Sequence, residues 1–182
     1  MTAQQIDLRL VRPDPRYRDS FMGMVREYAS VGDLKFAELK SLLETNFDGY
    51  VTLLLNQEKP AASVTSRVSQ TSFWYVDARG ELIGTIRLRH ALTQSLRSDG
   101  GHIGYDVRPQ ARNKGYATQM LHAVLEEARK LGLAEVLLTC AADNTPSARV
   151  IEKCGGILEK EAFCPETGKM SRYYWIKLAP AR

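Results

Sequence analysis

The feature that most constrains this fold is a long helical pattern that begins directly after a strand. Apolar residues recur at helical spacing over about four turns, at Ala117, Met120, Leu121, Val124, Leu125, Ala128 and Leu131. Gly132 follows as a natural residue to end the helix. Before the helix, Ile103–Val107 alternates in the manner of a strand, and residues 108–112 leave room only for a short turn. A strand that leads through a turn into an amphipathic helix predicts an α/β chain.

The rest of the sequence divides into similar short elements. Further strands are predicted at Ile6–Val11, Ser72–Asp77, Leu82–His90, Glu135–Cys140, Ile157–Phe163 and Arg172–Leu178. Helices are predicted after the caps Asp14-Pro15, Asp33 and Thr145-Pro146, whereas Tyr50–Leu55 fits a helix or a strand and Gln57–Gln70 reads as a loop. The predicted order is β-α-α-β-β-β-α-β-α-β-β. It corresponds to one α/β (α+β) domain over residues 1–182, with a mixed, mostly antiparallel sheet flanked by helices.

Charge and cysteine content narrow the classes of partner. The net charge of +4 is spread along the chain, whereas a nucleic-acid binder more often gathers its Lys and Arg on one stripe. Three cysteines without a CxxC pair, and three histidines without zinc spacing, predict no metal site and a reducing, cytoplasmic compartment. No apolar run reaches the length of a signal peptide or a membrane span. The oligomeric state stays open between a monomer and a homodimer.

The segment YDVRPQARNKGYA, residues 105–117, carries the clearest chemical signal. The first turn of a helix presents unpaired N–H groups and the positive end of the helix dipole. Gly115 lets a ligand approach the backbone closely, and Arg108, Arg112 and Lys114 surround the turn. Together these features suit phosphate oxygens. An ordinary turn with Asn113 as a helix cap explains the same residues, and the segment alone does not decide between the two.

Two motifs together resemble the GNAT superfamily of N-acetyltransferases. Residues 112–117, RNKGYA, match the R/Q-x-x-G-x-G/A loop of that family. Residues 144–156, NTPSARVIEKCGG, match its second signature, in which an Asn precedes a Glu-Lys-x-Gly near the end of a helix. The two motifs stand at the expected separation, which is more specific than either motif alone. The order of predicted elements fits as well.

The resemblance implies that acetyl-coenzyme A is the cosubstrate and assigns residues to it. Backbone N–H groups of Asn113, Lys114, Gly115, Tyr116 and Ala117, together with Arg112, would hold the pyrophosphate. The strand Tyr105, Asp106 and Val107 would bond to the pantetheine arm, with the amide of Val107 near the thioester carbonyl. Asn144 and the helix that follows it, including Ile151, would line the other side.

The chain departs from the family where a general acid is expected. Many members carry a Tyr that protonates the departing thiolate, and Ile151 occupies that position here. Gly156 stands where an aromatic residue is usual. Tyr105, Tyr173 and Tyr174 are the alternative acids, although most buried tyrosines are simply packed. Cys140 is a weaker candidate for an acyl-enzyme route, because inert packing is the commoner role for such a residue.

The general base is also undetermined by sequence. His102 lies ten residues before Arg112, where relatives place a carboxylate or His. Strict alternation turns its side chain away from Tyr105, unless a bulge reorients it. A structural role for His102 is the competing interpretation, and His102 and Tyr105 are the two catalytic candidates.

The sequence leaves three functions open. The first is an N-acetyltransferase in which a primary amine attacks acetyl-coenzyme A directly in a ternary complex. Removing a proton costs about 4.6 kcal/mol at pH 7 for a lysine amine and about 1.4 kcal/mol for an α-amine. If the enzyme has no strong general base, an α-amine is therefore the easier acceptor. The second is a non-catalytic module that senses acyl-coenzyme A. The third, an acyltransferase acting on aminoacyl-tRNA, rests only on a pI near 9.0. The acceptor pocket is expected from Tyr17–Leu55 and Phe163–Tyr174.

Overall fold

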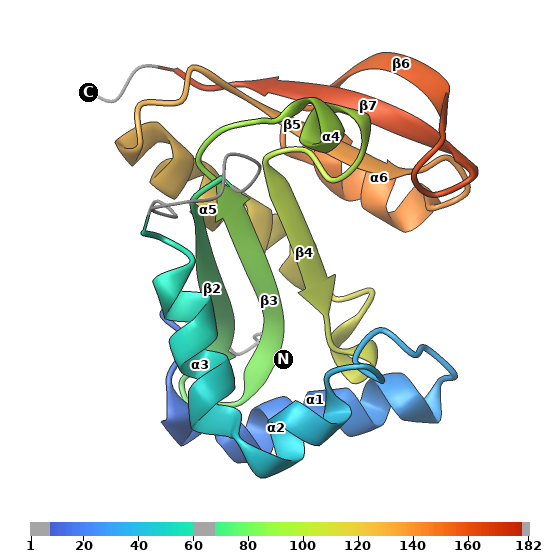
Figure 1. Cartoon of the computed structure of the whole chain (residues 1–182). Coiled ribbons are helices and arrows are strands. Elements are labelled where there is room, and N and C mark those ends of the chain that lie inside the picture. Colours follow the sequence, from blue (N-terminus) through green and yellow to red (C-terminus); the bar gives the residue numbers. More distant parts are fainter. Residues whose placement is uncertain (1–7, 60–67, 180–182) are drawn as a thin grey trace, which may run out of the picture.

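The computed structural model describes residues 8–59 and 68–179, and its strands form two sheets (Figure 1). The first sheet has the order β1-β2-β3-β4, and the second has the order β5-β7-β6. Every ladder in the described residues is antiparallel. An α/β fold with a mixed, mostly antiparallel sheet flanked by helices was predicted, and this fold class is confirmed. The strands are, however, divided between two sheets.

The first sheet is built from local hairpins and one N-terminal strand. Its members are β1 (Leu8–Val11), β2 (Gln70–Asp77), β3 (Leu82–Arg89) and β4 (Ile103–Val107). Between β2 and β3, Asp77 accepts hydrogen bonds from the N–H groups of Arg79 and Glu81 through its side chain. The tight turn this creates fixes a register in which Trp74 pairs with Thr85. In β3, Arg87 pairs with Gly104 of β4.

The second sheet contains the C-terminal hairpin. It consists of β5 (Glu135–Ala141), β6 (Ile157–Cys164) and β7 (Lys169–Lys177), with β7 in the centre. The edge strand β6 is largely exposed on both faces, and Ile157, Leu158 and Phe163 are among its exposed apolar residues. Figure 1 shows this sheet crossing the molecule above the first sheet.

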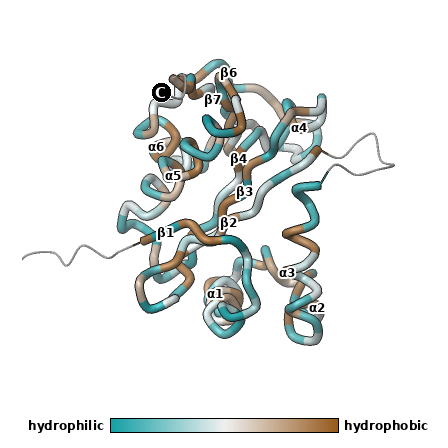
Figure 2. The backbone as a smooth tube through the Cα atoms, turned by 90° about the vertical axis from the view of Figure 1, so that its left-hand side faces the viewer, coloured by the Kyte–Doolittle hydropathy of each residue, from teal (hydrophilic) through white to brown (hydrophobic). Residues whose placement is uncertain are grey.

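Helices cover the two faces of the first sheet separately. On one face lies α5 (Tyr116–Lys130), and α6 (Thr145–Lys153) packs against α5 and against β5 of the second sheet. On the opposite face lie α1 (Arg18–Ser30), α2 (Lys40–Thr45) and α3 (Phe47–Asn56) (Figure 2). Short 3-10 turns, η1 (Pro15–Tyr17) and η2 (Pro109–Ala111), precede α1 and the loop before α5.

Each helical layer encloses its own apolar core. The core under α5 and α6 includes Leu121, Val124, Ile86 and Tyr174, all almost fully buried. The core under α1 to α3 is aromatic, and Phe21 contacts Phe36, Phe47, Tyr50 and Trp74. Figure 2 shows the apolar segments of the strands running between these two layers. The sheet is therefore buried on both faces in its lower part.

Several helix boundaries differ from those predicted. The helix predicted to follow Asp33 begins at Lys40, because the carboxylate of Asp33 accepts from Lys35 N at 3.1 Å in a turn instead of capping α2. Residues 47–56, where helix and strand were both open, form α3 after the cap Asn46. The polar stretch before β4 contains a short helix, α4 (Gln94–Ser98), capped by Thr93. The predicted loop 57–70 lies mostly outside the described residues, although Gln70 N donates to Gln57 O across it.

Candidate functional site

The two sheets meet at one junction and then diverge. At the start of β4, His102 N donates to Leu137 O of β5 at 2.7 Å. Gly101 makes this approach possible, because a Cβ there would lie 2.3 Å from Leu137 O, and its φ of +57° is the left-handed region. From this point β4 and β5 separate, and Figure 1 shows β4 descending while β5 stays in the upper sheet. The facing edges of the two sheets therefore form a V.

The side chain of His102 is part of this junction, because its ring accepts a hydrogen bond from β5. Leu137 N donates to His102 Nδ1 at 2.9 Å, so the neutral ring carries its proton on Nε2. Neither nitrogen then offers a free lone pair. Burial, followed by the charges of Arg97 and Arg89, lowers the pKa of His102 to about 4. This geometry argues against the general base proposed from sequence and gives His102 the structural role that was the competing interpretation.

Because His102 Nδ1 accepts a hydrogen bond in the folded protein, we expect the free energy of unfolding to depend on pH. The unfolded ring binds a proton near pH 6.5 and the folded ring only near 4, so the folded state loses stability as the pH falls through this window. At pH 5 the loss from this residue is at most about 2 kcal/mol. We expect the unfolding free energy of wild type, measured in urea at pH 7.5 and 5.0, to fall more than that of His102→Gln. Equal falls in the two proteins would contradict the prediction.

The edge of β4 that faces the gap carries backbone groups not used by β3. Arg89 N donates to His102 O and Arg108 N donates to Ile83 O, and these bonds fix the alternation along β4. Gly104 and Asp106 therefore turn their backbone groups toward β3, whereas Tyr105 and Val107 turn theirs toward the gap. Tyr28 Oη donates to Val107 O at 3.0 Å. The amide of Val107, which was predicted to polarise a carbonyl, thus lies on the open edge.

The loop after β4 has the backbone form of an anion site. Asn113 and Gly115 have φ values of +61° and +79°, and α5 begins at Tyr116. A Cβ on Gly115 would meet no described atom within 4 Å. Among the described residues, no hydrogen bond is donated by the N–H of Asn113, Lys114 or Gly115. Successive N–H groups in such a turn, at the positive end of a long helix, suit phosphate oxygens. The helix begins later than predicted, and Gly115 is its cap.

The side chains of Arg108 and Arg112 bind groups outside this loop. Arg108 is buried: its guanidinium contacts Glu27 at 2.6 Å, Leu82 O at 2.9 Å, and Glu81. Arg112 donates from Nε to Val107 O at 3.3 Å and lies over the ring of Tyr28. Of the three cations predicted around the turn, Lys114 is the exposed one without an ion pair in the described residues. Anion binding by this loop therefore rests mainly on its backbone.

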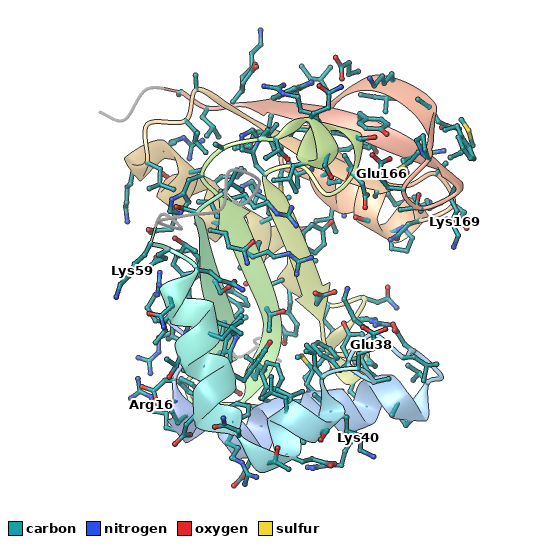
Figure 3. The ribbon with its side chains drawn as sticks, in the orientation of Figure 1. Arg16, Glu38, Lys40, Lys59, Glu166 and Lys169 are labelled. Carbon is teal, nitrogen blue, oxygen red and sulfur yellow. The ribbon has the colours of Figure 1, made fainter. Side chains whose placement is uncertain are left out.

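A cavity of about 480 Å³ opens where the sheets diverge. Tyr105 of β4, Cys140 of β5, and Asn144 and Ser147 at the start of α6 form one wall. Arg87 and Arg89 of β3 also line the cavity, as do the carboxylates of Asp99 and Glu166. In Figure 3, Glu166 lies on the β6–β7 turn nearest to α4, and its carboxylate accepts from Ser98 Oγ at 2.8 Å.

Tyr105 and Ser147 form a hydroxyl pair across the cavity wall. Their oxygens are 2.8 Å apart, and Tyr105 Oη also lies 3.3 Å from Ser147 O. Burial raises the pKa of Tyr105 to about 12, so the phenol keeps its proton at neutral pH. The other two candidate acids are engaged elsewhere, because Tyr173 donates to Ser98 O and Tyr174 donates to Glu152. Burial also raises the pKa of the Cys140 thiol, which disfavours a nucleophilic thiolate.

Two residues predicted to contact the cosubstrate do not face the gap. Ile151 is completely buried in the core, and a Cβ on Gly156 would lie 2.4 Å from its Cγ2. Asp106 points to the opposite face of β4, where it pairs with Lys35. Asn144 lines the cavity, but its Oδ1 accepts from Ser147 N as the cap of α6. Tyr116 and Ala117 open α5, beside the loop.

Sequence reasoning did not single out Ser147, Arg87, Arg89 or Lys35 as site residues. Ser147 stood inside the second motif, three residues after Asn144. Arg87 and Arg89 alternate on an otherwise apolar strand, which was the available signal. Lys35 lies in the segment predicted as a helix after Asp33, and no pattern there marked it as a site residue. No group of three or more His, Cys, Asp or Glu that could hold a metal ion occurs in residues 8–59 and 68–179. Across the same residues, no helix is long and apolar enough to cross a membrane.

Comparison with known proteins identifies relatives of this arrangement. Residues 50–157 match the family model of the acetyltransferase (GNAT) domain. The uncharacterized N-acetyltransferase YnaD of Bacillus subtilis is 32% identical over 74 residues, which cover 40% of this chain and 42% of that protein. The chain thus spans about two fifths of that curated relative.

Two solved structures share the fold at low identity. One is an acetyltransferase from Salmonella typhimurium that modifies the N-terminal serine of ribosomal protein L7/L12 (TM-score 0.66, 16% identity, 97% of each chain). The other is the microcin C7 self-immunity acetyltransferase MccE in complex with acetyl-CoA and AMP (TM-score 0.64, 13% identity, 94% of this chain and 92% of that one).

Proposed function

The chain belongs to the GNAT acetyltransferase family, and from this premise we propose that it transfers the acetyl group of acetyl-coenzyme A to a primary amine. The observation that carries the proposal is the diverging edge of β4 beside the loop at the start of α5. The edge offers the amide of Val107, and the loop offers unpaired N–H groups. These groups fit a ligand that has a carbonyl at one end and phosphates at the other.

The loop residues hold the cosubstrate in this proposal. The N–H groups of Asn113, Lys114, Gly115, Tyr116 and Ala117 bind the pyrophosphate, and Lys114 adds a positive charge. The backbone of Tyr105 and Val107 bonds to the arm that lies along the β4 edge. Acetyl-coenzyme A supplies an activated acetyl group, and the chain's residues orient it toward the cavity.

The reaction is a direct attack in a ternary complex. The amine nitrogen attacks the thioester carbonyl carbon, the C–N bond forms, the C–S bond breaks and the sulfur departs as thiolate. Val107 N–H stabilises the negative charge that develops on the carbonyl oxygen. The ammonium proton passes to water, because both ring nitrogens of His102 are unavailable as bases and Asp106 pairs with Lys35. A low-pKa α-amine suits such a site better than a lysine.

Tyr105 and Ser147 stabilise the leaving sulfur in this proposal. A phenol of pKa about 12 would transfer its proton to a thiolate of pKa about 8.5 only at a cost of ~5 kcal/mol. The hydroxyls therefore donate hydrogen bonds to the thiolate, and the thiolate later takes a proton from water. In this proposal, the hydroxyls of Tyr105 and Ser147 act on the thiolate in place of the Tyr that many family members carry at the position of Ile151.

The hydroxyl pair predicts a defined loss of turnover. A hydrogen bond to a charged group contributes about 1.5–3 kcal/mol, so we expect Tyr105→Phe to lower kcat roughly 10- to 100-fold. Thiol release from acetyl-coenzyme A with a panel of α-amines and lysine-like amines measures it and also tests the proposed function. Tyr173→Phe is the matched control, because its hydroxyl is bound to Ser98 O. An undiminished kcat in Tyr105→Phe would remove the tyrosine from the mechanism.

The acceptor class follows from the same reasoning. The structural neighbour from Salmonella typhimurium modifies an N-terminal serine, which is an α-amine on a peptide. An α-amine is also what a site without a strong base favours. Turnover on the amine panel separates this proposal from a non-catalytic sensor of acyl-coenzyme A. An enzyme for aminoacyl-tRNA would be recognised by RNA binding with a steep salt dependence. A cytoplasmic location and a homodimer remain predictions.

A further inference from the structure

Two arginines form the positively charged side of the cavity. Arg87 and Arg89 are two residues apart on β3, so both side chains leave the same face of the sheet. The guanidinium of Arg87 lies over Gly104 of β4. A Cβ on Gly104 would be only 2.9 Å from Arg87 NH2. The absence of a side chain at Gly104 thus gives Arg87 its position. Both arginines line the cavity that also contains Tyr105 and Ser147.

Arg89 is held in place by backbone carbonyls. Its NH1 donates to Gly100 O and Gly101 O, each at 2.8 Å. Burial and then the charge of Arg87 lower the pKa of Arg89 to about 10, so it stays charged at neutral pH. Two like charges fixed side by side in a partly buried cavity repel each other, and an anion placed between them relieves that repulsion.

The carboxylates around the cavity offset the charge of this pair only in part. Asp106 is the nearest, with Oδ2 4.0 Å from Arg87 NH1, but it contacts Lys35 directly. Asp99 and Glu166 line the cavity from α4 and from the β6–β7 turn. Neither forms an ion pair with Arg87 or Arg89 in the described residues. The charge of Asp99 partly offsets the lowering of the Arg89 pKa, but Asp99 and Glu166 make no direct contact with either guanidinium in the described residues, so both arginines keep N–H donors for a ligand.

We propose that Arg87 and Arg89 bind an oxyanion of the acceptor, a carboxylate or a phosphate, so that the substrate is an acidic amine. The guanidinium groups match the planar, bidentate geometry of such oxyanions. This inference rests on the proposed function for the position of the reacting amine. It disfavours a polyamine, because a second ammonium group would meet the arginines.

The spacing along the strands limits where the anionic group sits in the acceptor. Arg87 pairs with Gly104, which is three residues before Val107 on β4. At about 3.3 Å per residue, this separation is ~10 Å along the strand. The side chain of Arg87 can span part of this separation. In a peptide acceptor, the anionic group is therefore expected one or two residues from the amine. An acidic second residue, or a short phosphorylated amine, meets this requirement.

Matched pairs of acceptors test the proposal. The peptides Ser-Asp-Ala-amide and Ser-Asn-Ala-amide differ only in one carboxylate, and phosphoethanolamine differs from ethanolamine only in its phosphate. We expect kcat/KM for the acidic member of at least one pair to exceed that of the neutral member about tenfold at low salt. In Arg87→Gln this preference is expected to disappear through a higher KM. Which pair shows it identifies the carboxylate or the phosphate as the natural group.

Controls separate this inference from the proposed function. Arg79→Gln removes an exposed arginine of the β2–β3 turn, and we expect it to keep the preference. Arg87 is chosen over Arg89, because Arg89 also holds two carbonyls. Calorimetry of the acidic peptide or phosphoethanolamine, with coenzyme A present, tests the arginine site without turnover. Weaker binding to Arg87→Gln than to wild type supports the arginine site even if no amine is acetylated. A lack of acetylation would overturn only the proposed function. Turnover with no acidic preference in either pair, or equal binding by both proteins, overturns the arginine site.

Discussion

Gly115→Val is expected to lower the affinity for acetyl-coenzyme A at least about 100-fold while the protein stays folded. Gly115 has a φ of +79°, which a β-branched residue adopts only with strain. Valine would pull the loop toward negative φ and turn the N–H groups of Lys114 and Gly115 away from the ligand. Losing two hydrogen bonds to charged oxygens costs about 3 kcal/mol or more. Helix propensity plays no part, because Gly115 precedes the first turn of α5.

A second glycine of the same helix provides the control. Gly132 ends α5 with a φ of +78°, and a Cβ there also meets no described atom within 4 Å. Gly132→Val therefore imposes the same backbone strain at the far end of the helix. Calorimetric titration with acetyl-coenzyme A, after circular dichroism has shown both variants to be folded, compares them. If Gly115→Val binds as tightly as Gly132→Val, the loop is not the phosphate site.

Arg108→Met is expected to lower the free energy of unfolding by about 3–5 kcal/mol. The side chains of Arg108 and Glu27 are only 10% and 11% exposed, and they bind each other at 2.6 Å. Removing the guanidinium leaves the carboxylate of Glu27 buried without its cation, and also leaves Leu82 O without a donor. For a chain of this size the change corresponds to a fall in Tm of roughly 10 °C. Urea denaturation at pH 7 measures it.

Two further variants identify the cause of this loss. Arg172→Met breaks the more exposed pair with Glu161, and we expect a loss of less than about 1 kcal/mol. The double variant Arg108→Met with Glu27→Met removes both buried charges, and we expect it to be more stable than Arg108→Met alone. A double variant as unstable as the single one would mean that packing, and not the unpaired charge, is responsible.

The elements with strong periodicity were predictable from sequence, and the junction between the sheets was not. Helix α5 repeats its apolar residues over its whole length, and strands such as β3 alternate, so local patterns were sufficient. Helix α4 has five residues and no buried side chain, so it leaves no apolar signal. The start of α2 was misplaced because Asp33 forms a turn with Lys35 that competes with capping.

The site was predictable where it depends on the backbone and less so where it depends on contacts between distant segments. The loop at Gly115 follows from a glycine between a strand and a helix. The role of His102 depends on Leu137, 35 residues away, which no local pattern reveals. The burial of Arg108 depends in the same way on Glu27 of α1. Asp106 could have been placed correctly, because strand alternation alone turns it away from Tyr105.

The open edge of β4 also has a consequence for the behaviour of the protein in solution. Unpaired strand edges are templates for pairing with other chains, and proteins usually cover them, charge them or twist them away. Here the edges of β4 and β5 face each other across the V, so each shields the other from a neighbouring molecule. A ligand chain that bonds along β4 acts as the missing strand between them. Under the proposed function, binding would therefore fill the gap between the sheets, and we expect it to reduce edge-to-edge aggregation of the protein.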